Sequence, residues 1–314
     1  MLGILGGGFG LYGYLPAAAK LLQEPVLLLK KYKPIIDSRQ ELFSFKDQII
    51  WLESEEELMQ TADSLVISRR PIDQEALVSR CLLEVNLKRV MFEKPLATSP
   101  EKAQKILQLM ANSNKYCSVG FNFRFTNWAI QLKEKLLNGE FSEHESINLS
   151  WHFMADHFSR NIESWKMDHA QGGGAIRFYG IHVIALLAEL GYEHVESSSV
   201  LTSNSKHSFC DWRACFKGPG LPTFLVNLNS KSNASHFNLY LGNKDQPLLE
   251  GLNPFDTVLN KLTISEQDTR CIYLQDALEE LFNLTKPYPN RIECCTKLWQ
   301  LVETKTFSSA GYQK

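Results

Sequence analysis

The chain has 314 residues, a formal net charge of −2, and 44% hydrophobic and 22% charged residues. These proportions are those of an ordinary soluble globular protein, and the near-neutral charge gives no indication of a nucleic acid or an anionic membrane as partner. At this length two domains are expected rather than a single core.

The amino terminus and the cysteines give no sign of export. The opening stretch MLGILGGGFG is apolar, but it has no basic lead-in and is too short to span a bilayer. The seven cysteines have neither metal-ligand nor disulfide-framework spacing, so reduced thiols are the simplest account. We therefore expect a cytoplasmic protein.

A buried strand is predicted over residues 2–5, and a glycine-rich stretch follows it directly. Its glycines are Gly6, Gly7, Gly8, Gly10 and Gly13. Glycines there let backbone N–H groups approach a pyrophosphate, and the helix predicted over 14–23 adds the positive end of its dipole. The GxGxxG spacing is met by Gly8, Gly10 and Gly13, whereas the strand register favours Gly6, Gly8 and Gly10. A glycine-rich connection without a ligand stays the alternative.

A second strand, predicted over 26–29, ends in Lys30 and Lys31, twenty residues after Gly10. An acidic residue commonly binds the ribose hydroxyls of NAD at that place, and a basic residue can accommodate the 2′-phosphate of NADP. The sequence therefore favours NADP over NAD. Lysines that simply face water are the alternative.

Strands and helices then alternate. Strands are predicted over 49–52 and 64–68, and each is followed by a helix, over 53–60 and 74–83. This alternation is typical of a right-handed parallel sheet. A sixth strand over 116–120 closes a first domain at about residue 121.

The stretch RVMFEKPLA, at 89–97, is the fifth strand and its end. An apolar run suits a strand buried on both faces, and it stops at Glu93, Lys94 and Pro95. Pro95 cannot extend the ladder and favours an extended Lys94, which places the lysine at the rim where open α/β sheets bind ligands. On composition alone, a solvated Lys–Glu pair is the alternative.

Four motifs resemble the Gfo/Idh/MocA oxidoreductases, dehydrogenases that act mostly on sugars and cyclitols. They are GGGFGLYGYLPA at 6–17, MFEKPLA at 91–97, VGFNFRF at 119–125 and GGGAIRFYGIH at 172–182. The resemblance implies an α/β fold with an N-terminal Rossmann domain, a doubly wound parallel sheet, over 1–121. It also implies a second α/β domain with a large, mainly antiparallel sheet over 122–289. The C-terminal segment 290–314, with a helix over about 290–302, would pack back on the Rossmann domain.

The resemblance also implies site residues. The glycines at 6, 8 and 10 match the family's pyrophosphate loop, and the lysine of its EKP motif lies beside the nicotinamide and the substrate. Together with the strand ends, this gives an expected cofactor-binding set of Gly6, Gly8, Phe9, Gly10, Lys30, Lys31, Arg69, Glu93 and Lys94. The expected substrate-binding set is Arg124, Trp165, Lys166, Phe178 and His182.

The chain departs from the family pattern at several positions. Tyr14 and Gln74 stand where many members have histidine. The largest departure is Phe178, because members usually place an Asp four residues before the catalytic histidine, on the same helix face. Phe178 can instead stack against a sugar ring or a nucleobase, and Tyr179 can offer a hydroxyl in place of the carboxylate.

The expected catalytic residues are Lys94, His182 and Tyr179. Hydride transfer from a secondary alcohol needs a base for the hydroxyl proton, and histidine, with an ordinary pKa of about 6.5, suits that task. Lys94 would hold the oxygen and stabilise its negative charge. The helix predicted over 174–190 is apolar almost all round, so a core histidine is the alternative for His182.

The rest of the second domain carries weaker signals. His152, Asp156 and His157 lack a convincing third ligand, so no metal is expected. Strands over 195–201, 209–216, 223–229 and 237–241 would form the sheet whose exposed face usually mediates dimers or tetramers in the family. The stretch 243–267 is less regular and suits an edge loop or contact arm.

We therefore expect an NAD(P)-dependent oxidoreductase acting on a sugar, a sugar acid or a nucleotide-linked sugar. The expected partners are a polyhydroxylated small-molecule substrate and further copies of the chain. Binding to a nucleic acid or to a membrane is not expected. Two other classes stay open. One is a lyase, hydrolase or epimerase that uses tightly held cofactor in a transient oxidation, and the other is a cofactor-binding protein without catalysis.

Overall fold

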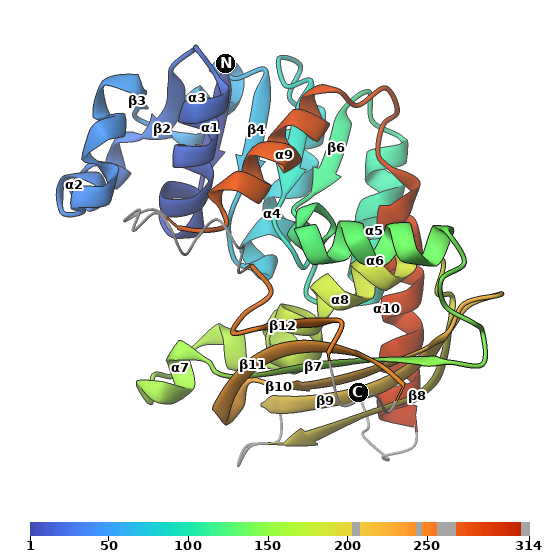
Figure 1. Cartoon of the computed structure of the whole chain (residues 1–314). Helices are drawn as coiled ribbons and strands as arrows, with labels where there is room; N and C mark the ends of the chain where they lie inside the picture. Colours follow the sequence, from blue (N-terminus) through green and yellow to red (C-terminus); the bar gives the residue numbers. More distant parts are fainter. Residues whose placement is uncertain (203–207, 243–246, 256–267, 309–314) are drawn as a thin grey trace. The chain divides into compact units, whose positions relative to one another are not determined.

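The computed structural model describes residues 1–202, 208–242, 247–255 and 268–308, and its backbone is drawn in Figure 1. The chain divides into two compact units. The first unit is Met1–Ala97, Gln104–Phe125 and Thr257–Asn290, and the second unit is Thr98–Ala103, Thr126–Asp256 and Arg291–Lys314.

The first unit is built on a six-stranded sheet with the order β3-β2-β1-β4-β5-β6, in which all neighbouring strands are parallel. The strands are β1 (Leu2–Leu5), β2 (Val26–Leu29), β3 (Ile49–Leu52), β4 (Ser64–Ile67), β5 (Arg89–Phe92) and β6 (Tyr116–Val119). Every residue of β1, β2 and β4 is buried, as expected for strands covered on both faces. The strand order reverses between β1 and β4, so the predicted doubly wound parallel sheet is confirmed.

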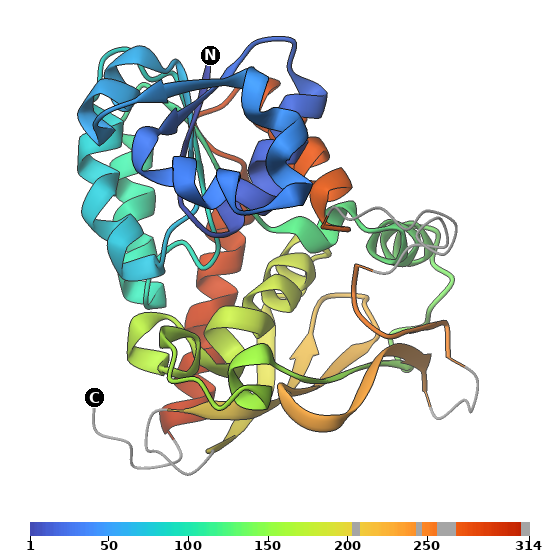
Figure 2. The same ribbon diagram turned by 90° about the vertical axis from the view of Figure 1, so that its left-hand side faces the viewer.

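Helices cover this sheet. They are α1 (Leu15–Leu21), α2 (Lys33–Asp37), α3 (Glu55–Thr61), α4 (Pro71–Leu83), α5 (Pro100–Ala111) and α9 (Cys271–Phe282). In Figure 2, α1 and α9 lie on one side of the sheet and α4 lies on the other. The N-cap of α3 is Ser54, whose hydroxyl accepts a hydrogen bond from Glu57 N.

The second unit is built on a six-stranded sheet with the order β12-β11-β7-β10-β9-β8. The strands are β7 (Ser146–Met154), β8 (His194–Thr202), β9 (Phe209–Lys217), β10 (Thr223–Asn229), β11 (Lys231–Leu241) and β12 (Leu249–Gly251). Only the β7–β10 pair is parallel, so the expected mainly antiparallel sheet is confirmed for the described residues. The helices are α6 (Asn127–Leu137), α7 (Asp156–Ser159), α8 (Ile181–Glu189) and α10 (Asn290–Ser308).

Several elements differ from the predicted ones. A π-helix, Gly10–Tyr14, lies before α1, where a glycine-rich loop is predicted up to residue 13. A second π-helix, Ala175–Gly180, precedes α8 within the helix predicted over 174–190. β11 begins at Lys231, six residues before the predicted start. Its first half is polar, so the apolar pattern does not predict that part of the strand. Of the stretch 243–267, the structure shows β12, and residues 243–246 and 256–267 lie outside the described part.

The two units also divide the chain differently from the predicted boundaries at 121 and 289. The segment 257–290, predicted in the second domain, groups with the first unit, where α9 contacts α1 and Cys271 Sγ lies 3.6 Å from Gly13 O. The helix α10 groups with the second unit, and its predicted packing on the Rossmann domain stays a prediction. Its Thr306 hydroxyl lies 2.6 Å from the Ser198 hydroxyl of β8.

Within the described residues, no helix combines the length and the hydropathy that crossing a bilayer requires.

Candidate functional site

The glycine-rich loop follows β1, and its glycines meet different surroundings. A Cβ on Gly6 would lie 2.2 Å from Ser68 O, and one on Gly10 would lie 3.0 Å from Ile4 Cγ2. Backbone packing therefore excludes a side chain at Gly6, and at Gly10 the Ile4 side chain would have to move by a few tenths of an ångström. A Cβ on the exposed Gly8 would meet no described heavy atom within 4 Å. The open space over Gly8 fits a ligand that approaches the backbone closely.

Phe9 explains the last glycine of this loop. A Cβ on Gly13 would lie 2.5 Å from Phe9 Cε2, so Gly13 makes room for the Phe9 ring. The guanidinium of Arg270 lies 4.3 Å from the centroid of that ring and pairs with Asp268, with Nη2 2.5 Å from Oδ2. Gly13 thus serves internal packing. The sequence does not predict the contact of Arg270 and Asp268 with this loop, because more than 250 residues separate them from Phe9.

The predicted basic cluster lies where β2 and β4 end, and two carboxylates join it. Lys30 Nζ lies 2.6 Å from Glu53 Oε1, and Lys31 Nζ lies 3.2 Å from Glu55 Oε1. Arg69 Nη2 lies 2.5 Å from the same Glu55 oxygen, and this hydrogen bond lowers the pKa of Glu55. The three cations and two carboxylates leave one net positive charge. The sequence does not predict a role for Glu53 and Glu55 in this cluster, because both lie in the acidic helix predicted over 53–60.

The end of β5 carries a buried carboxylate. Glu93 is 7% exposed, and its Oε1 accepts a hydrogen bond of 2.6 Å from the Tyr14 hydroxyl, while its Oε2 accepts one of 3.2 Å from Lys94 N. A Cβ on Gly120 would lie 2.7 Å from the Tyr14 oxygen, so glycine leaves room for the pair. Burial raises the pKa of Glu93, against the opposing effect of the positive charge of Lys94. Burial also holds the pKa of Tyr14 well above its ordinary value, so Tyr14 remains a donor.

Gln74 reaches the same turn from α4 and is completely buried. A local sequence signal marks this residue, because Gln74 is the polar member of a buried stripe formed by Pro71, Leu77, Val78 and Cys81.

Arg124 lies in a 3₁₀ turn, Asn122–Phe125, of the first unit. Its Nη1 lies 2.6 Å from Glu280 Oε2 of α9, and its guanidinium lies 4.7 Å from the centroid of the Phe125 ring. Its predicted role toward the substrate stays a prediction.

Three predicted residues of the second unit gather around one ring. Trp165 contacts Phe178 edge-on with centroids 5.3 Å apart, and Lys166 Nζ lies 5.3 Å from the Phe178 centroid. Tyr179 contacts the same ring at 4.7 Å. These side chains thus form a half-buried aromatic surface with one cation.

Tyr179 continues this aromatic cluster. Its ring lies 4.9 Å from that of Phe153 and 6.0 Å from that of Trp151. Burial holds the pKa of Tyr179 above its ordinary value, so the phenol stays protonated. Tyr179 can donate a hydrogen bond but is not a base.

His182 lies in the first turn of α8 and is 6% exposed. Its ring meets that of Phe255 edge-on at 6.3 Å. The preceding turn is π-helical, a distortion often found at functional sites. A Cβ on Gly180 would lie 2.8 Å from the Trp212 ring, so glycine lets this helix pack closely against β9.

A buried ion pair anchors the π-helix. Arg177 Nε lies 2.7 Å from Glu303 Oε1 and Nη2 lies 2.5 Å from Glu303 Oε2, while Nη1 donates to His169 O. Trp299 Nε1 donates to the same carboxylate at 2.7 Å. Because these partners come from distant parts of the sequence, sequence reasoning did not detect them.

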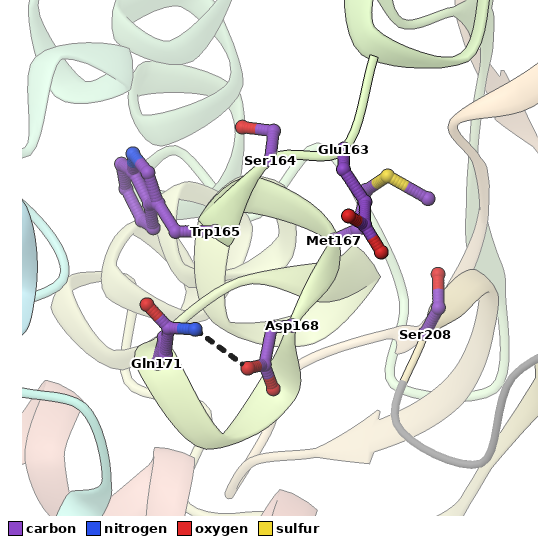
Figure 3. Close-up of a pocket in the computed structure, with 7 residues that line it drawn as sticks. All are labelled: Glu163, Ser164, Trp165, Met167, Asp168, Gln171 and Ser208. Atoms are coloured by element: carbon purple, nitrogen blue, oxygen red, sulfur yellow. Dashed lines mark hydrogen bonds between the residues drawn. The ribbon is translucent and has the colours of Figure 1, made fainter. Parts of the chain in front are cut away.

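A pocket of about 390 Å³ lies beside Trp165 in the second unit (Figure 3). It is lined by Glu163, Ser164, Trp165, Met167, Asp168, Gln171 and Ser208. Asp168 accepts a hydrogen bond of 2.8 Å from Gln171 Nε2, so this carboxylate is already bonded within the loop. The lining combines one aromatic side chain with hydrogen-bonding groups and two carboxylates, which fits a hydroxylated ligand better than an anion.

The histidines of β7 and its neighbour form no recognisable metal centre. His152 and His236 lie opposite each other with ring centroids 4.6 Å apart. Across the described residues, no group of three or more His, Cys, Asp or Glu side chains could hold a metal ion.

The doubly wound parallel sheet of the first unit is a fold that often binds dinucleotides. Residues 3–121 match the model of an oxidoreductase family described by its NAD-binding Rossmann fold. This domain belongs to the Gfo/Idh/MocA oxidoreductases, and the predicted family is confirmed there. An 85-residue stretch is 28% identical to YteT of Bacillus subtilis (strain 168), which is assigned as an oxidoreductase. The match covers 27% of this chain and only 20% of that protein's length.

Solved structures share the fold over nearly the whole chain. The WlbA dehydrogenase from Chromobacterium violaceum, in complex with NADH and UDP-GlcNAcA, aligns with a TM-score of 0.73 at 13% identity, covering 97% of this chain and 94% of that one. The 3-ketoreductase KijD10 from Actinomadura kijaniata, in complex with NADP and TDP-benzene, gives 0.70 at 13% identity, with 96% and 95% covered. An NAD-binding oxidoreductase from Klebsiella pneumoniae gives 0.72 at 14% identity, with 98% and 96% covered.

Proposed function

We propose that the protein is an NAD(P)-dependent oxidoreductase that transfers hydride between the cofactor and a sugar, a sugar acid or a nucleotide-linked sugar. The observation that carries this proposal is the Glu93–Lys94 turn. It presents a half-buried lysine at the carboxyl end of β5, in a domain of an NAD-binding oxidoreductase family. That end of a parallel sheet is where ligands bind. Two proteins of the same fold are crystallised with a dinucleotide and a sugar nucleotide or a nucleotide analogue.

The glycine-rich loop would bind the cofactor. Gly6, Gly8, Phe9 and Gly10 form the turn after β1, and the open space over Gly8 fits a pyrophosphate against the backbone. The dinucleotide, when bound, supplies the hydride acceptor or donor of the reaction. Glu93 and Lys94 would lie at its nicotinamide end.

NADP is the favoured cofactor. Lys30, Lys31 and Arg69 stand at the strand ends where the adenosine ribose is bound in this fold. Their two carboxylate partners neutralise them incompletely, and the remaining positive charge favours a 2′-phosphate. The measured ratio of the affinities for NADPH and NADH decides this point.

Lys94 and His182 would carry the proton chemistry. Lys94, as a cation, would hold the reacting oxygen and stabilise negative charge on it. His182 would exchange the hydroxyl proton of the substrate, as a base in oxidation and as an acid in reduction. Tyr179 would add a hydroxyl donor, since its raised pKa keeps its proton in place.

Phe178 would recognise the substrate by contact with a ring face. Trp165 and Lys166 border the Phe178 ring, so a sugar or a base can lie on an aromatic surface with a cation beside it. Arg124 would add a positive charge at the site.

The outer face of the second sheet would bind another copy of the chain. Asn238, Ser150 and Asn227 lie in one cross-strand row on β11, β7 and β10. In the described part of the chain, the buried atoms Asn238 Oδ1, Asn227 Oδ1 and His152 Nε2 have no hydrogen-bond partner. A facing copy would pair with the accessible polar groups of this half-buried row, because amides and hydroxyls both donate and accept. Light scattering that gives a monomer would contradict this assignment.

A cytoplasmic location is proposed on the state of the thiols. All seven cysteines are free, and burial raises the pKa of Cys81, Cys117 and Cys295. Inert, reduced thiols suit a reducing compartment.

The experiment that tests the proposal has two stages. NADPH or NADH should raise the melting temperature, since a ligand that binds only the native state stabilises it. A panel of keto-sugars should then give steady oxidation of the reduced cofactor. Release of bound cofactor on denaturation, without net turnover, would favour the transient-oxidation reaction instead. No melting shift with any nucleotide would contradict both enzyme assignments.

A further inference from the structure

Gln74 is a polar residue in a place that packing alone would fill with a hydrocarbon. Its side chain is 0% exposed on the apolar stripe of α4. Burying an amide costs free energy unless its donors and acceptor find partners. The position of those partners therefore indicates what the amide does.

Among the described residues, the hydrogen bonds of the Gln74 side chain all go to the turn that contains Lys94. Its Nε2 donates to Glu93 O at 2.8 Å, to Leu96 O at 3.0 Å and to Pro95 O at 3.3 Å. Its Oε1 accepts a hydrogen bond of 2.9 Å from Glu93 N. One side chain thus bonds the backbone on both sides of Lys94.

The turn needs such a partner because the sheet ends there. The β4–β5 ladder stops at the Ile67–Phe92 pair, and Glu93 N still donates to Ile67 O at 3.0 Å. Beyond it, Pro95 has no N–H, and the carbonyls that follow turn away from the ladder. Gln74 takes over the role of the neighbouring strand for these carbonyls.

We propose that Gln74 is a positioning residue for Lys94. It fixes the backbone before and after the lysine, and the Tyr14–Glu93 hydrogen bond fixes the turn from a side chain as well. The side chain of Lys94 therefore projects from a turn whose backbone is held on both sides of the lysine. The inference rests on the catalytic role proposed for Lys94 and concerns how that role is maintained.

The variants separate positioning from general packing. Gln74→Met keeps the length and volume of the side chain and removes all four hydrogen bonds. Val78→Ala is the matched control, since Val78 is 1% exposed on the same stripe and one turn further along α4. If Gln74→Met does not fold, Gln74→Asn withdraws the same amide by one methylene and serves in its place.

A double-mutant cycle with Lys94→Met gives the decisive readout. Turnover is measured with the keto-sugar that the panel selects, and cofactor affinity by nicotinamide fluorescence. We expect Gln74→Met to lower kcat by about 10²-fold, the size of effect known for small misplacements, with the dissociation constant of the cofactor changed less than about twofold. In the Lys94→Met background, Gln74→Met should have no further effect on kcat. Val78→Ala should lower the melting temperature without changing kcat more than about twofold.

Equal losses of kcat in both backgrounds would overturn the proposal, because Gln74 would then act independently of Lys94. Hydrogen exchange tests the positioning without any substrate. The Glu93 and Lys94 amides should exchange faster in Gln74→Met and normally in Val78→Ala, and unchanged exchange in Gln74→Met would overturn the positioning role by itself. Full turnover by Lys94→Met would instead contradict the proposed function of the lysine.

Discussion

The turn at Glu93–Lys94 and the helical segment around Phe178 are held in place by different forces. In the turn, a buried amide, a buried phenol and a carboxylate are joined by hydrogen bonds to one another and to the backbone. Around Phe178, aromatic rings pack edge-on, and a single buried ion pair, Arg177–Glu303, anchors the backbone.

This difference indicates which substitutions each region can tolerate. A hydrogen-bonded turn depends on particular donors and acceptors at fixed places. Ring packing depends on shape and area, so it does not require a particular donor or acceptor at each position. Under the proposed function, Lys94 would act from the first region, and the second region would supply His182 and the ring surface for the substrate.

Removal of the anchor of the second region should have the largest effect. Arg177→Met leaves Glu303 buried without its bidentate partner, and breaking such a pair typically costs about 3–5 kcal/mol. Urea denaturation should show this loss in the free energy of unfolding. A loss below about 1 kcal/mol would mean that the ion pair is not what holds the π-helix.

Lys94→Met should separate the two regions by function. The half-buried lysine contributes little to the core, so the melting temperature should change by only a few degrees. The value of kcat/KM should fall by about 10²–10³-fold, the usual loss when one group that stabilises a developing negative charge is removed. Unchanged steady-state kinetics would exclude Lys94 from the reaction.

Phe178→Leu should act on recognition alone. Leucine keeps apolar volume beside Trp165 and Lys166 but removes the ring face. A ring contact contributes about 0.5–1.5 kcal/mol, so KM for the sugar substrate should rise by up to about tenfold while kcat stays the same. A fall in kcat with an unchanged KM would place Phe178 in the chemistry instead.

The pH dependence of stability should show the smallest effect, and it belongs to the second region. Burial, with the positive charge of Lys166, lowers the pKa of His157 below its ordinary value of 6.5. The unfolded chain therefore takes up a proton before the native state does, and stability is lost as pH falls through 6.5 toward the native pKa. Thermal melts between pH 7.5 and 5.5 should show this loss, at below about 1 kcal/mol. In His157→Phe the dependence should be weaker, and an equally steep curve would assign it to other groups.

The strands of the first unit could be predicted closely because each is a buried apolar run between turn residues. The residues around the predicted site could not. Glu53 and Glu55 pair with lysines and an arginine of other strand ends, which only the tertiary structure brings together. The apolar pattern around His182 predicts a helix, but it does not distinguish the π-helical turn from the α-helical one that follows.

The other side-chain pairs of the candidate site could not be predicted because their members lie far apart in the sequence. Arg177 and Glu303 are 126 positions apart, and Tyr14 and Glu93 are 79 apart. No local pattern connects such residues. Gln74 is intermediate, because a polar residue on an apolar stripe can be noticed in the sequence, although its partners cannot be named from it.

The central claim, that the loop after β1 binds a nicotinamide dinucleotide, is tested most directly at Gly8. A methyl group there meets open space in the protein, so Gly8→Ala should melt within about one degree of the unmodified protein. The same methyl group would stand where a pyrophosphate approaches the backbone. In a fluorescence titration with NADPH and NADH, we predict saturable binding to the unmodified protein and at least about tenfold weaker binding to Gly8→Ala. Equal binding by both proteins, or none by the unmodified protein, would contradict the account.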